Sequence, residues 1–185
     1  MGKVIVWNLV TLDGYFEGTK KWDLDFHNRA WGPELEALSL EFGDKAQAIV
    51  FGRVTYEGMA AYWPTAEGEG RVKTYMNALP KIVASRTMEK ADWNNSRVVR
   101  DAAAELRRLK GESEKNLYIF GSADLVASLL PENVVDEIML CLVPVQLGDG
   151  TPFFKKATAA TPFGLLEARP LSNGSVILRY APEAA

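Results

Sequence analysis

The sequence predicts a three-layer α/β fold, with a mainly parallel central sheet, helices on both of its faces and an antiparallel hairpin at its C-terminal end. Short apolar runs alternate with segments whose apolar residues recur at helical spacing, and this order is typical of parallel sheets. Ser172-Asn173-Gly174 separates the last two apolar runs and predicts a tight turn between antiparallel strands. At 185 residues and 48% hydrophobic content, the chain suits a single domain, residues 1–185, whose core needs no disulfides.

The first half of the chain alternates predicted strands and helices around one long loop. Residues 11–28 are polar and aromatic and include two glycines, which predicts a loop. Pro33 fits the first turn of a helix, and Leu35 and Leu38 follow it at a spacing that places them on one helical face. The predicted strands are residues 3–10, 46–51 and 81–84, and the predicted helices are residues 33–42, 55–61 and 71–78.

The second half continues the alternation and ends in the hairpin. Asp101 is predicted to cap a helix that Gly111 ends. Cys141 alternates with apolar neighbours in a predicted strand, which indicates a buried and inert thiol, whereas Glu137 is interpreted as a solvated residue at a strand edge. The predicted strands are residues 97–100, 116–120, 134–143, 163–169 and 175–180, and the predicted helices are residues 102–110 and 121–130.

Composition excludes several classes of partner. The net charge is −3 with both signs interspersed, which argues against a nucleic-acid surface and offers no basic patch for an anionic membrane. The one cysteine, Cys141, cannot form an intramolecular disulfide, so a reducing cytoplasm is expected. The one histidine, His27, lies far from it in sequence, and no metal site is predicted.

A phosphate-binding corner is predicted where strand 46–51 ends. Gly52 permits close backbone approach, Arg53 supplies positive charge and the Thr55 hydroxyl can donate a hydrogen bond. The start of the following helix offers free N–H groups to an anion. The alternative is an ordinary strand–turn–helix corner capped by Thr55, with Arg53 in solvent.

Two further strands end in a similar way. Ser85-Arg86-Thr87 follows strand 81–84 and suits a phosphate monoester such as the 2′-phosphate of NADPH, with a solvated loop as the alternative. Gly121-Ser122-Ala123 follows strand 116–120, and its small residues allow a pyrophosphate to approach, with tight helix–sheet packing as the alternative. Because parallel strands end at one edge of a sheet, the three corners together favour a bound dinucleotide.

Five motifs, in their order and spacing, carry a resemblance to a known family: Thr11-Leu12-Asp13-Gly14-Tyr15, residues 52–57, Ser85-Arg86-Thr87, Phe120-Gly121-Ser122-Ala123 and residues 143–154. The chain resembles the dihydrofolate-reductase-like superfamily. Within it, the chain is most similar to the reductase domain of the bifunctional riboflavin-biosynthesis deaminase-reductase, and especially to stand-alone bacterial relatives of that domain. The resemblance covers nearly the whole chain.

The resemblance implies a dihydrofolate-reductase-like fold and NADPH as hydride donor. The implied activity is that of a 5-amino-6-(5-phosphoribosylamino)uracil reductase, with hydride transfer to a small heterocyclic or sugar-linked substrate. The residues that it implies at the cofactor are Gly52, Arg53 and Thr55 at phosphates, Ser85 and Arg86 at the 2′-phosphate, and Gly121, Ser122 and Ala123 at the pyrophosphate.

Two departures from the family pattern affect the substrate. These residues contain no H-x-E with P-C-x-x-C zinc pattern, so the deaminase half is absent from them. The riboflavin enzyme needs basic residues for its ribose-phosphate substrate, and the first loop carries Lys20, Lys21 and Arg29 without an evident match.

The long first loop contains the expected catalytic and substrate residues. Asp13, which the resemblance places beside the nicotinamide, or Asp25, or a bound water, is expected to supply a proton. Trp22 and Phe26 are expected to line the substrate pocket, with anchoring of the loop as the alternative. For His27 the anchoring role is favoured.

Two rival functions stay open, and one partner is expected. The rivals are a dihydrofolate-type pterin reductase and a non-catalytic, dimeric NADPH-binding protein. A homodimer is expected because strand 134–143 and the hairpin would leave apolar surface and sheet edges exposed in a monomer, and because the related reductase domain also pairs.

Overall fold

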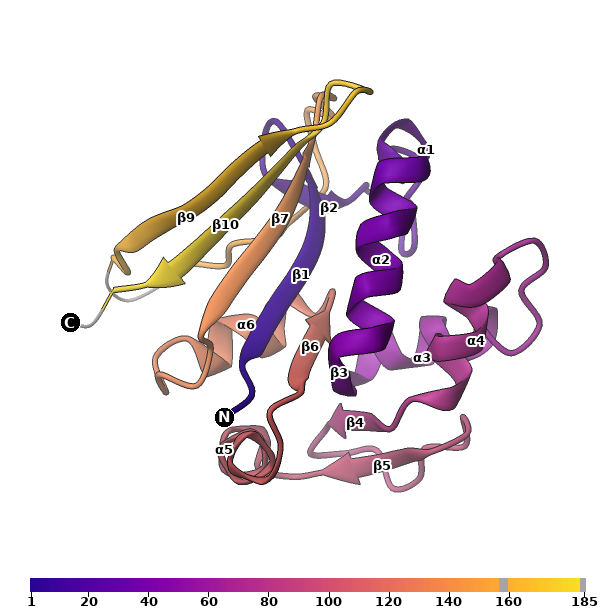
Figure 1. Cartoon of the computed structure of the whole chain (residues 1–185), viewed down its shortest axis with the longest axis vertical. Helices are drawn as coiled ribbons and strands as arrows, with labels where there is room; N and C mark the ends of the chain where they lie inside the picture. The colour runs from indigo at the N-terminus through magenta and orange to yellow at the C-terminus, as the bar shows by residue number, and fades with distance from the viewer. Residues whose placement is uncertain (157–159, 184–185) are drawn as a thin grey trace.

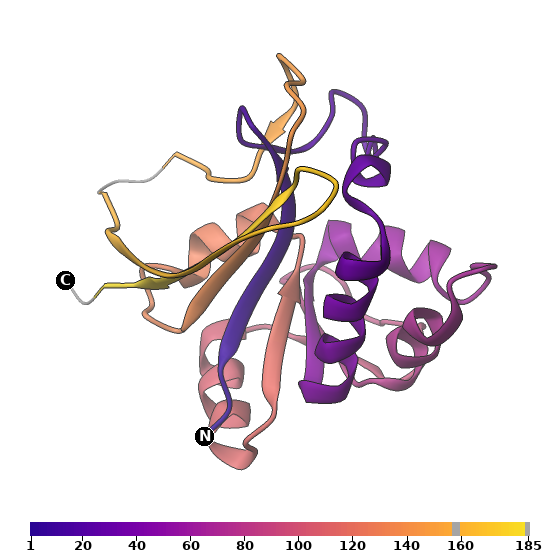
Figure 2. The same ribbon diagram turned by 45° about the horizontal axis from the view of Figure 1, so that its top comes forward.

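The computed structural model describes residues 1–156 and 160–183, and in them a large sheet separates two layers of helices (Figure 1 and Figure 2). The strands are β1 (Val4–Thr11), β2 (Tyr15–Glu17), β3 (Ala46–Gly52), β4 (Lys81–Ala84), β5 (Ser96–Val99), β6 (Asn116–Phe120), β7 (Glu137–Val143), β8 (Thr151–Pro152), β9 (Phe163–Pro170) and β10 (Val176–Pro182). The helices are α1 (His27–Ala30), α2 (Pro33–Lys45), α3 (Arg53–Tyr62), α4 (Gly70–Ala78), α5 (Ala102–Glu112) and α6 (Ala123–Leu129).

The main sheet has eight strands in the order β5-β4-β3-β6-β1-β7-β10-β9. The six strands from β5 to β7 are parallel, and β10 and β9 continue the sheet in antiparallel pairing. Strands β2 and β8 form a separate antiparallel pair. This arrangement confirms the predicted fold class of a mainly parallel sheet with an antiparallel C-terminal hairpin.

Alternate residues of the central strands are buried on opposite faces of the sheet. In β1, Val4 and Val6 pack in the core that contains Leu106 of α5 and Val126 of α6, whereas Ile5 packs in the other core. That second core is formed with helices α1 to α4. Because both faces are covered, the central strands are nearly continuous apolar runs, as expected for a parallel sheet. In the described residues, no helix is long and apolar enough to cross a membrane.

The first loop and one helix end differ from the sequence prediction. Residues 11–28, predicted as a loop, contain β2 and the start of α1. Strand β2 pairs with β8, more than a hundred residues away, so no local pattern marks it. Gly111 does not end its helix but lies inside α5, whereas Asp101 caps the start of α5 as predicted, accepting a hydrogen bond from the Ala104 N–H at 2.9 Å.

Glu137 corrects a second expectation, because it is fully buried instead of solvated. Strand β7 lies between β1 and β10 and is not an edge. The Glu137 carboxylate accepts two hydrogen bonds from the Arg179 guanidinium, at 2.6 and 3.1 Å, and lies 3.6 Å from the Lys3 ammonium. Cys141 of the same strand is buried, as predicted. A charge can be buried here because the paired guanidinium balances it.

We predict that Glu137→Ala lowers the free energy of unfolding by roughly 3 kcal/mol, because it leaves a partly buried guanidinium without its main partner. The matched control is Glu167→Ala, which removes the more exposed carboxylate on the same Arg179 and should cost less than about 1 kcal/mol. Urea unfolding of both variants measures the difference. Equal losses would contradict the assignment of Glu137 as the main partner.

Candidate active site

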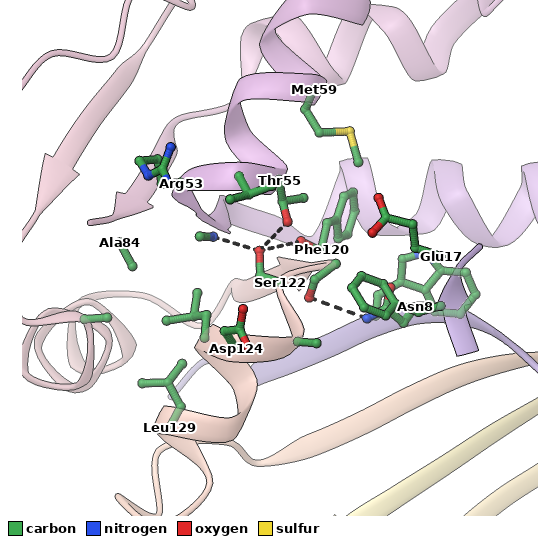
Figure 3. A pocket seen from close by; sticks show the side chains of 18 of the residues that line it. Asn8, Glu17, Arg53, Thr55, Met59, Ala84, Phe120, Ser122, Asp124 and Leu129 are labelled. Atoms are coloured by element: carbon green, nitrogen blue, oxygen red, sulfur yellow. Dashed lines mark hydrogen bonds between the residues drawn. The ribbon is translucent and has the colours of Figure 1, made fainter. Parts of the chain in front are cut away.

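A cavity of about 940 Å³ lies at the carboxyl ends of the parallel strands. The end of β3 contributes Gly52, the end of β4 contributes Ala84 and the end of β6 contributes Phe120. Figure 3 shows these ends approaching one another, with the start of α3 above and α6 below them. Open α/β sheets bind their ligands at this edge, so the cavity is the candidate active site.

The Ser122 hydroxyl joins the ends of β3 and β6 (Figure 3). Its oxygen accepts a hydrogen bond from the Gly52 N–H at 2.7 Å and lies 2.9 Å from the Thr55 hydroxyl oxygen. Ser122 adopts a left-handed backbone conformation, with φ at 62°. At Gly121, whose φ is also positive, a Cβ would lie 2.9 Å from Cγ2 of Thr55. Glycine is therefore required at position 121 for the two strand ends to meet.

The first turn of α3 is available to an anion. Its N-cap residue, Gly52, provides no side-chain hydrogen bond to the amides of that turn. The start of α5 differs, because the Asp101 carboxylate caps it. The unsatisfied N–H groups and the positive end of the dipole make the start of α3 the better site for a phosphate.

Basic side chains surround this part of the cavity. Arg53 pairs with Glu57 at 2.8 Å, and Arg100 donates to the carbonyl oxygen of Ser85 at 2.7 Å. Arg86 is exposed and forms no ion pair within the described residues. The Ser85 hydroxyl accepts from two backbone N–H groups in its own turn, so its proton is free to be donated. The basic residues that line the cavity are Arg53, Arg86, Arg100, Arg107 and Lys155.

The structure brings all eight predicted cofactor residues to this one cavity. They come from three strand ends that are far apart in sequence: Gly52, Arg53, Thr55, Ser85, Arg86, Gly121, Ser122 and Ala123. Trp22, one of the two predicted substrate residues, also lines the cavity. Within the described part of the chain, no three His, Cys, Asp or Glu residues gather as a metal site.

Three predicted residues lie outside the cavity lining. Asp13 is exposed and accepts hydrogen bonds from the Thr11 hydroxyl at 2.6 Å and the Gly148 N–H at 2.7 Å. These hydrogen bonds lower the pKa of Asp13, and they tie the first loop to the turn after β7. Asp25 is exposed, and Phe26 is buried in the core edge-on against the His27 ring. Asp13 and Phe26 therefore hold the loop in place, and the structure gives Asp25 no contact with the cavity.

Glu17 is a functional candidate that the sequence did not reveal. It lies on β2 and lines the cavity, on the same side of the pocket as Asn8 and Met59 in Figure 3. Its carboxylate accepts from the Trp22 N–H at 2.5 Å and from the Thr151 hydroxyl at 3.2 Å. Because the pairing of β2 with β8 places Glu17 there, no short motif could have identified it.

A known family model matches almost the whole chain. The model of the RibD C-terminal domain matches residues 2–177. Among curated proteins, the uncharacterized protein YyaP of Bacillus subtilis is 28% identical over 181 residues, covering 96% of this chain and 94% of YyaP.

Solved structures share the fold at low sequence identity. A protein of Shewanella sp. PV-4 assigned to riboflavin biosynthesis superimposes with a TM-score of 0.80 at 19% identity, covering 98% of this chain and 99% of that chain. The deaminase/5-amino-6-(5-phosphoribosylamino)uracil reductase of Thermotoga maritima gives 0.66 at 16% identity, with 98% and 57% covered. The Enterococcus faecalis dihydrofolate reductase complexed with NADP(H) gives 0.59 at 15% identity, with 99% and 98% covered. The fold is therefore dihydrofolate-reductase-like.

His27 lines the cavity in its neutral form. Burial lowers its pKa from 6.5 to about 4, and its Nε2 atom is buried without a hydrogen-bond partner among the described residues. Burial in surroundings that offer no compensating contact disfavours the charged ring.

We predict that the protein loses stability as the pH falls through the range between these two pKa values. In that range the unfolded chain binds a proton at His27 that the folded chain does not, so stability rises with pH. Between pH 7.5 and pH 5.5, the free energy of unfolding of His27→Gln should therefore fall by roughly 1 kcal/mol less than that of the wild type. Urea unfolding at both pH values provides the comparison, and carboxylate titrations cancel because both proteins have them. An identical pH dependence in the two proteins would rule out a buried neutral His27.

Proposed function

The chain belongs to the RibD C-terminal domain family, and we propose that it is an NADPH-dependent oxidoreductase that transfers hydride to a small heterocyclic or sugar-linked substrate. The observation that carries the proposal is the meeting of three strand ends, an uncapped helix start and five basic side chains at one cavity. The Thermotoga neighbour is named as a reductase, and the Enterococcus neighbour was solved with NADP(H). The activity proposed is of the type found in riboflavin biosynthesis.

The residues present fit a dinucleotide. The glycines at 52 and 121 let the ends of β3 and β6 approach each other at the cavity, and the first turn of α3 offers amides. In this proposal Gly52, Arg53 and Thr55 hold one phosphate group, and residues 121–123 lie along the pyrophosphate. Ser85 and Arg86 bind the 2′-phosphate, by hydroxyl donation and by charge.

The protein contributes alignment and exclusion of water, whereas the bound NADPH supplies the hydride. Asp13 keeps the first loop attached to residues 147 and 148, beside the strand pair β2–β8. That pair carries Glu17 into the cavity. The loop thereby positions the wall on which a substrate rests.

We also propose a cytoplasmic location. Its support is the lone cysteine, Cys141, which is buried and whose pKa burial raises to about 11. A protein with one unreactive thiol and no disulfide suits a reducing compartment.

We predict that Arg86→Ala weakens NADPH binding by roughly one to two decades and leaves NADH binding nearly unchanged. The reason is that a charge-assisted contact to the 2′-phosphate exists only for NADPH. Arg53→Ala is the matched variant. Arg53 is proposed to contact phosphates that both cofactors share, so its loss should weaken the binding of NADPH and of NADH alike. Titration calorimetry of each cofactor with the three proteins measures these changes.

Equal losses of NADPH and NADH affinity in Arg86→Ala would reject Arg86 as the reader of the 2′-phosphate. Binding of neither cofactor by the wild-type protein would reject the proposed function as a whole. Tight NADPH binding without oxidation, across pterins and pyrimidine substrates, would instead favour a non-catalytic NADPH-binding protein.

We propose further that the protein forms a homodimer through the β7–β10–β9 end of the sheet. Strand β9 is an edge, and Leu165 and Leu166 on it are 58% and 51% exposed. Beside it, an apolar hollow is lined by Ile138, Leu140, Phe154, Phe163 and Tyr180. An exposed edge with apolar side chains is the kind of surface that pairs with a second copy.

We predict that Leu165→Glu converts a dimer to a monomer at micromolar concentration, because a buried carboxylate without a partner is costly. Leu12→Glu is the matched control, since Leu12 is 61% exposed and follows β1, which β7 and β10 separate from β9. Sedimentation velocity of the wild type and both variants measures the association. A monomeric wild type would reject the dimer, and a dimeric Leu165→Glu protein would reject this interface.

A further inference from the structure

The two ends of the large cavity differ in charge. In Figure 3, Arg53 and Ala84 lie at one end and Asn8, Glu17 and Met59 at the other, with the Thr55–Ser122 junction between them. The lining lysine and arginine side chains belong to the first end, at the strand ends β3 to β5, on α5, and at Lys155, which pairs with Asp124 of α6. Within residues 1–156 and 160–183, no lysine or arginine lines the second end.

The second end is instead aromatic. Four of the five tryptophans of the chain line the cavity, together with Tyr75. Trp63 donates to the Met59 sulfur at 3.2 Å and Trp22 donates to Glu17, which places both residues at the second end. We name it the aromatic end, defined by Trp7, Trp22, Trp31, Trp63 and Tyr75. Flat aromatic faces bind planar rings by stacking and cations by their negative quadrupole, and they cannot satisfy an anion.

One of these rings, that of Trp22, is attached to a strained backbone. Trp22 has a φ of 65°, which is unusual for a bulky residue. Its indole packs so closely on α3 that a Cβ at Gly58 would lie 1.7 Å from the ring. Its backbone N–H donates to Glu17 at 2.5 Å. Strain of this kind persists only where the surroundings hold it, and it is concentrated at functional sites.

Glu17 is the one charged side chain at the aromatic end, within the described residues. His27 is uncharged at neutral pH, because burial lowers its pKa to about 4. Of the cations in the first loop, Lys21 lies 4.0 Å from Glu57, outside the lining. An anionic group placed at this end would lie beside a carboxylate with no cation to balance it.

We propose that the aromatic end binds a flat nitrogen heterocycle that carries no phosphate or carboxylate group and presents an N–H or a positive charge to Glu17. This inference rests on the proposed function and names its substrate class. Reduction of a C=N bond in such a ring takes hydride at carbon from NADPH, which becomes NADP⁺, and one proton from solvent at nitrogen. The substrate differs from a ribose-phosphate pyrimidine in lacking the phosphate.

The test uses three ligands that share one bicyclic ring and differ in charge: quinoline, N-methylquinolinium and quinoline-4-carboxylate. Their binding to the wild-type protein is measured by titration calorimetry at saturating NADP⁺. We expect the cation to bind at least as tightly as the neutral ring, and the carboxylate to bind about tenfold or more weakly than either. A carboxylate that binds as tightly as quinoline overturns the inference, and so does the absence of binding by all three.

Glu17→Gln separates the charge of this residue from the shape of the site. We expect the cation to lose about tenfold in affinity relative to quinoline, whose own affinity stays within about twofold. Glu41→Gln, on the exposed surface of α2 outside the cavity, is the matched control and should leave all three affinities unchanged. An unchanged preference for the cation in Glu17→Gln overturns the assignment of Glu17. The wild-type series tests the aromatic end even where the variant fails to fold.

A second pair of ligands tests the phosphate directly. 5-Amino-6-(5-phosphoribosylamino)uracil and its dephosphorylated form are titrated under the same conditions. We expect the phosphate to add no affinity, and a gain of about tenfold from it would overturn the inference. Failure of the proposed function is recognised separately, because it removes binding of the dinucleotide, and NADPH and NADP⁺ are each titrated into the protein before the ring ligands are added.

Discussion

The cavity depends on the close approach of the ends of β3 and β6. Gly52 leaves space for the Ser122 hydroxyl, which accepts from the Gly52 N–H at 2.7 Å, and Gly121 leaves space for the Thr55 side chain. Ser122 must adopt a left-handed conformation to do so, which costs on the order of 1 kcal/mol. The hydrogen bonds of its side chain offset that cost. The same junction lies between the two ends of the cavity, so a cofactor and a substrate placed there would meet beside Thr55 and Ser122.

The division of charge follows from where each end is built. The end that carries the lining lysine and arginine side chains is formed at strand ends and helix starts, where side chains reach solvent. The pair of Arg53 with Glu57 joins two exposed side chains, and the pair of Lys155 with Asp124 has one exposed partner, Asp124, so each contributes little to stability. A phosphate can replace the carboxylates at small cost. The aromatic end is formed over the core by large rings, which exclude water and strengthen the influence of the single carboxylate of Glu17.

Local sequence patterns predicted the parts of the protein that local interactions determine. The strand at residues 81–84 and the cap at Asp101 are short-range features, and both were predicted correctly. The fold class and the family likewise followed from the order of strands and motifs. The convergence of three strand ends needed one further rule, that parallel strands end at one edge. Long-range pairing leaves no local pattern, so the sequence does not predict β2, β8 or the position of Glu17 at the cavity. Glu137 was wrongly expected at a solvated strand edge, because the strand that covers it, β10, comes late in the chain.

The Glu17 side chain connects the cavity wall on β2 to helix α3 through Trp22. Glu17 faces the cavity from β2 while its carboxylate holds the backbone of Trp22, whose ring rests on Gly58 of α3. A ligand that draws the Glu17 carboxylate away weakens the contact that fixes a strained residue. A ligand that donates to its free lone pairs leaves that contact intact. The geometry therefore favours ligands that donate a hydrogen bond to Glu17 over ligands that displace its bond to the Trp22 N–H. An anion offers Glu17 no donor, so the aromatic end has a second reason, besides charge, to reject anions.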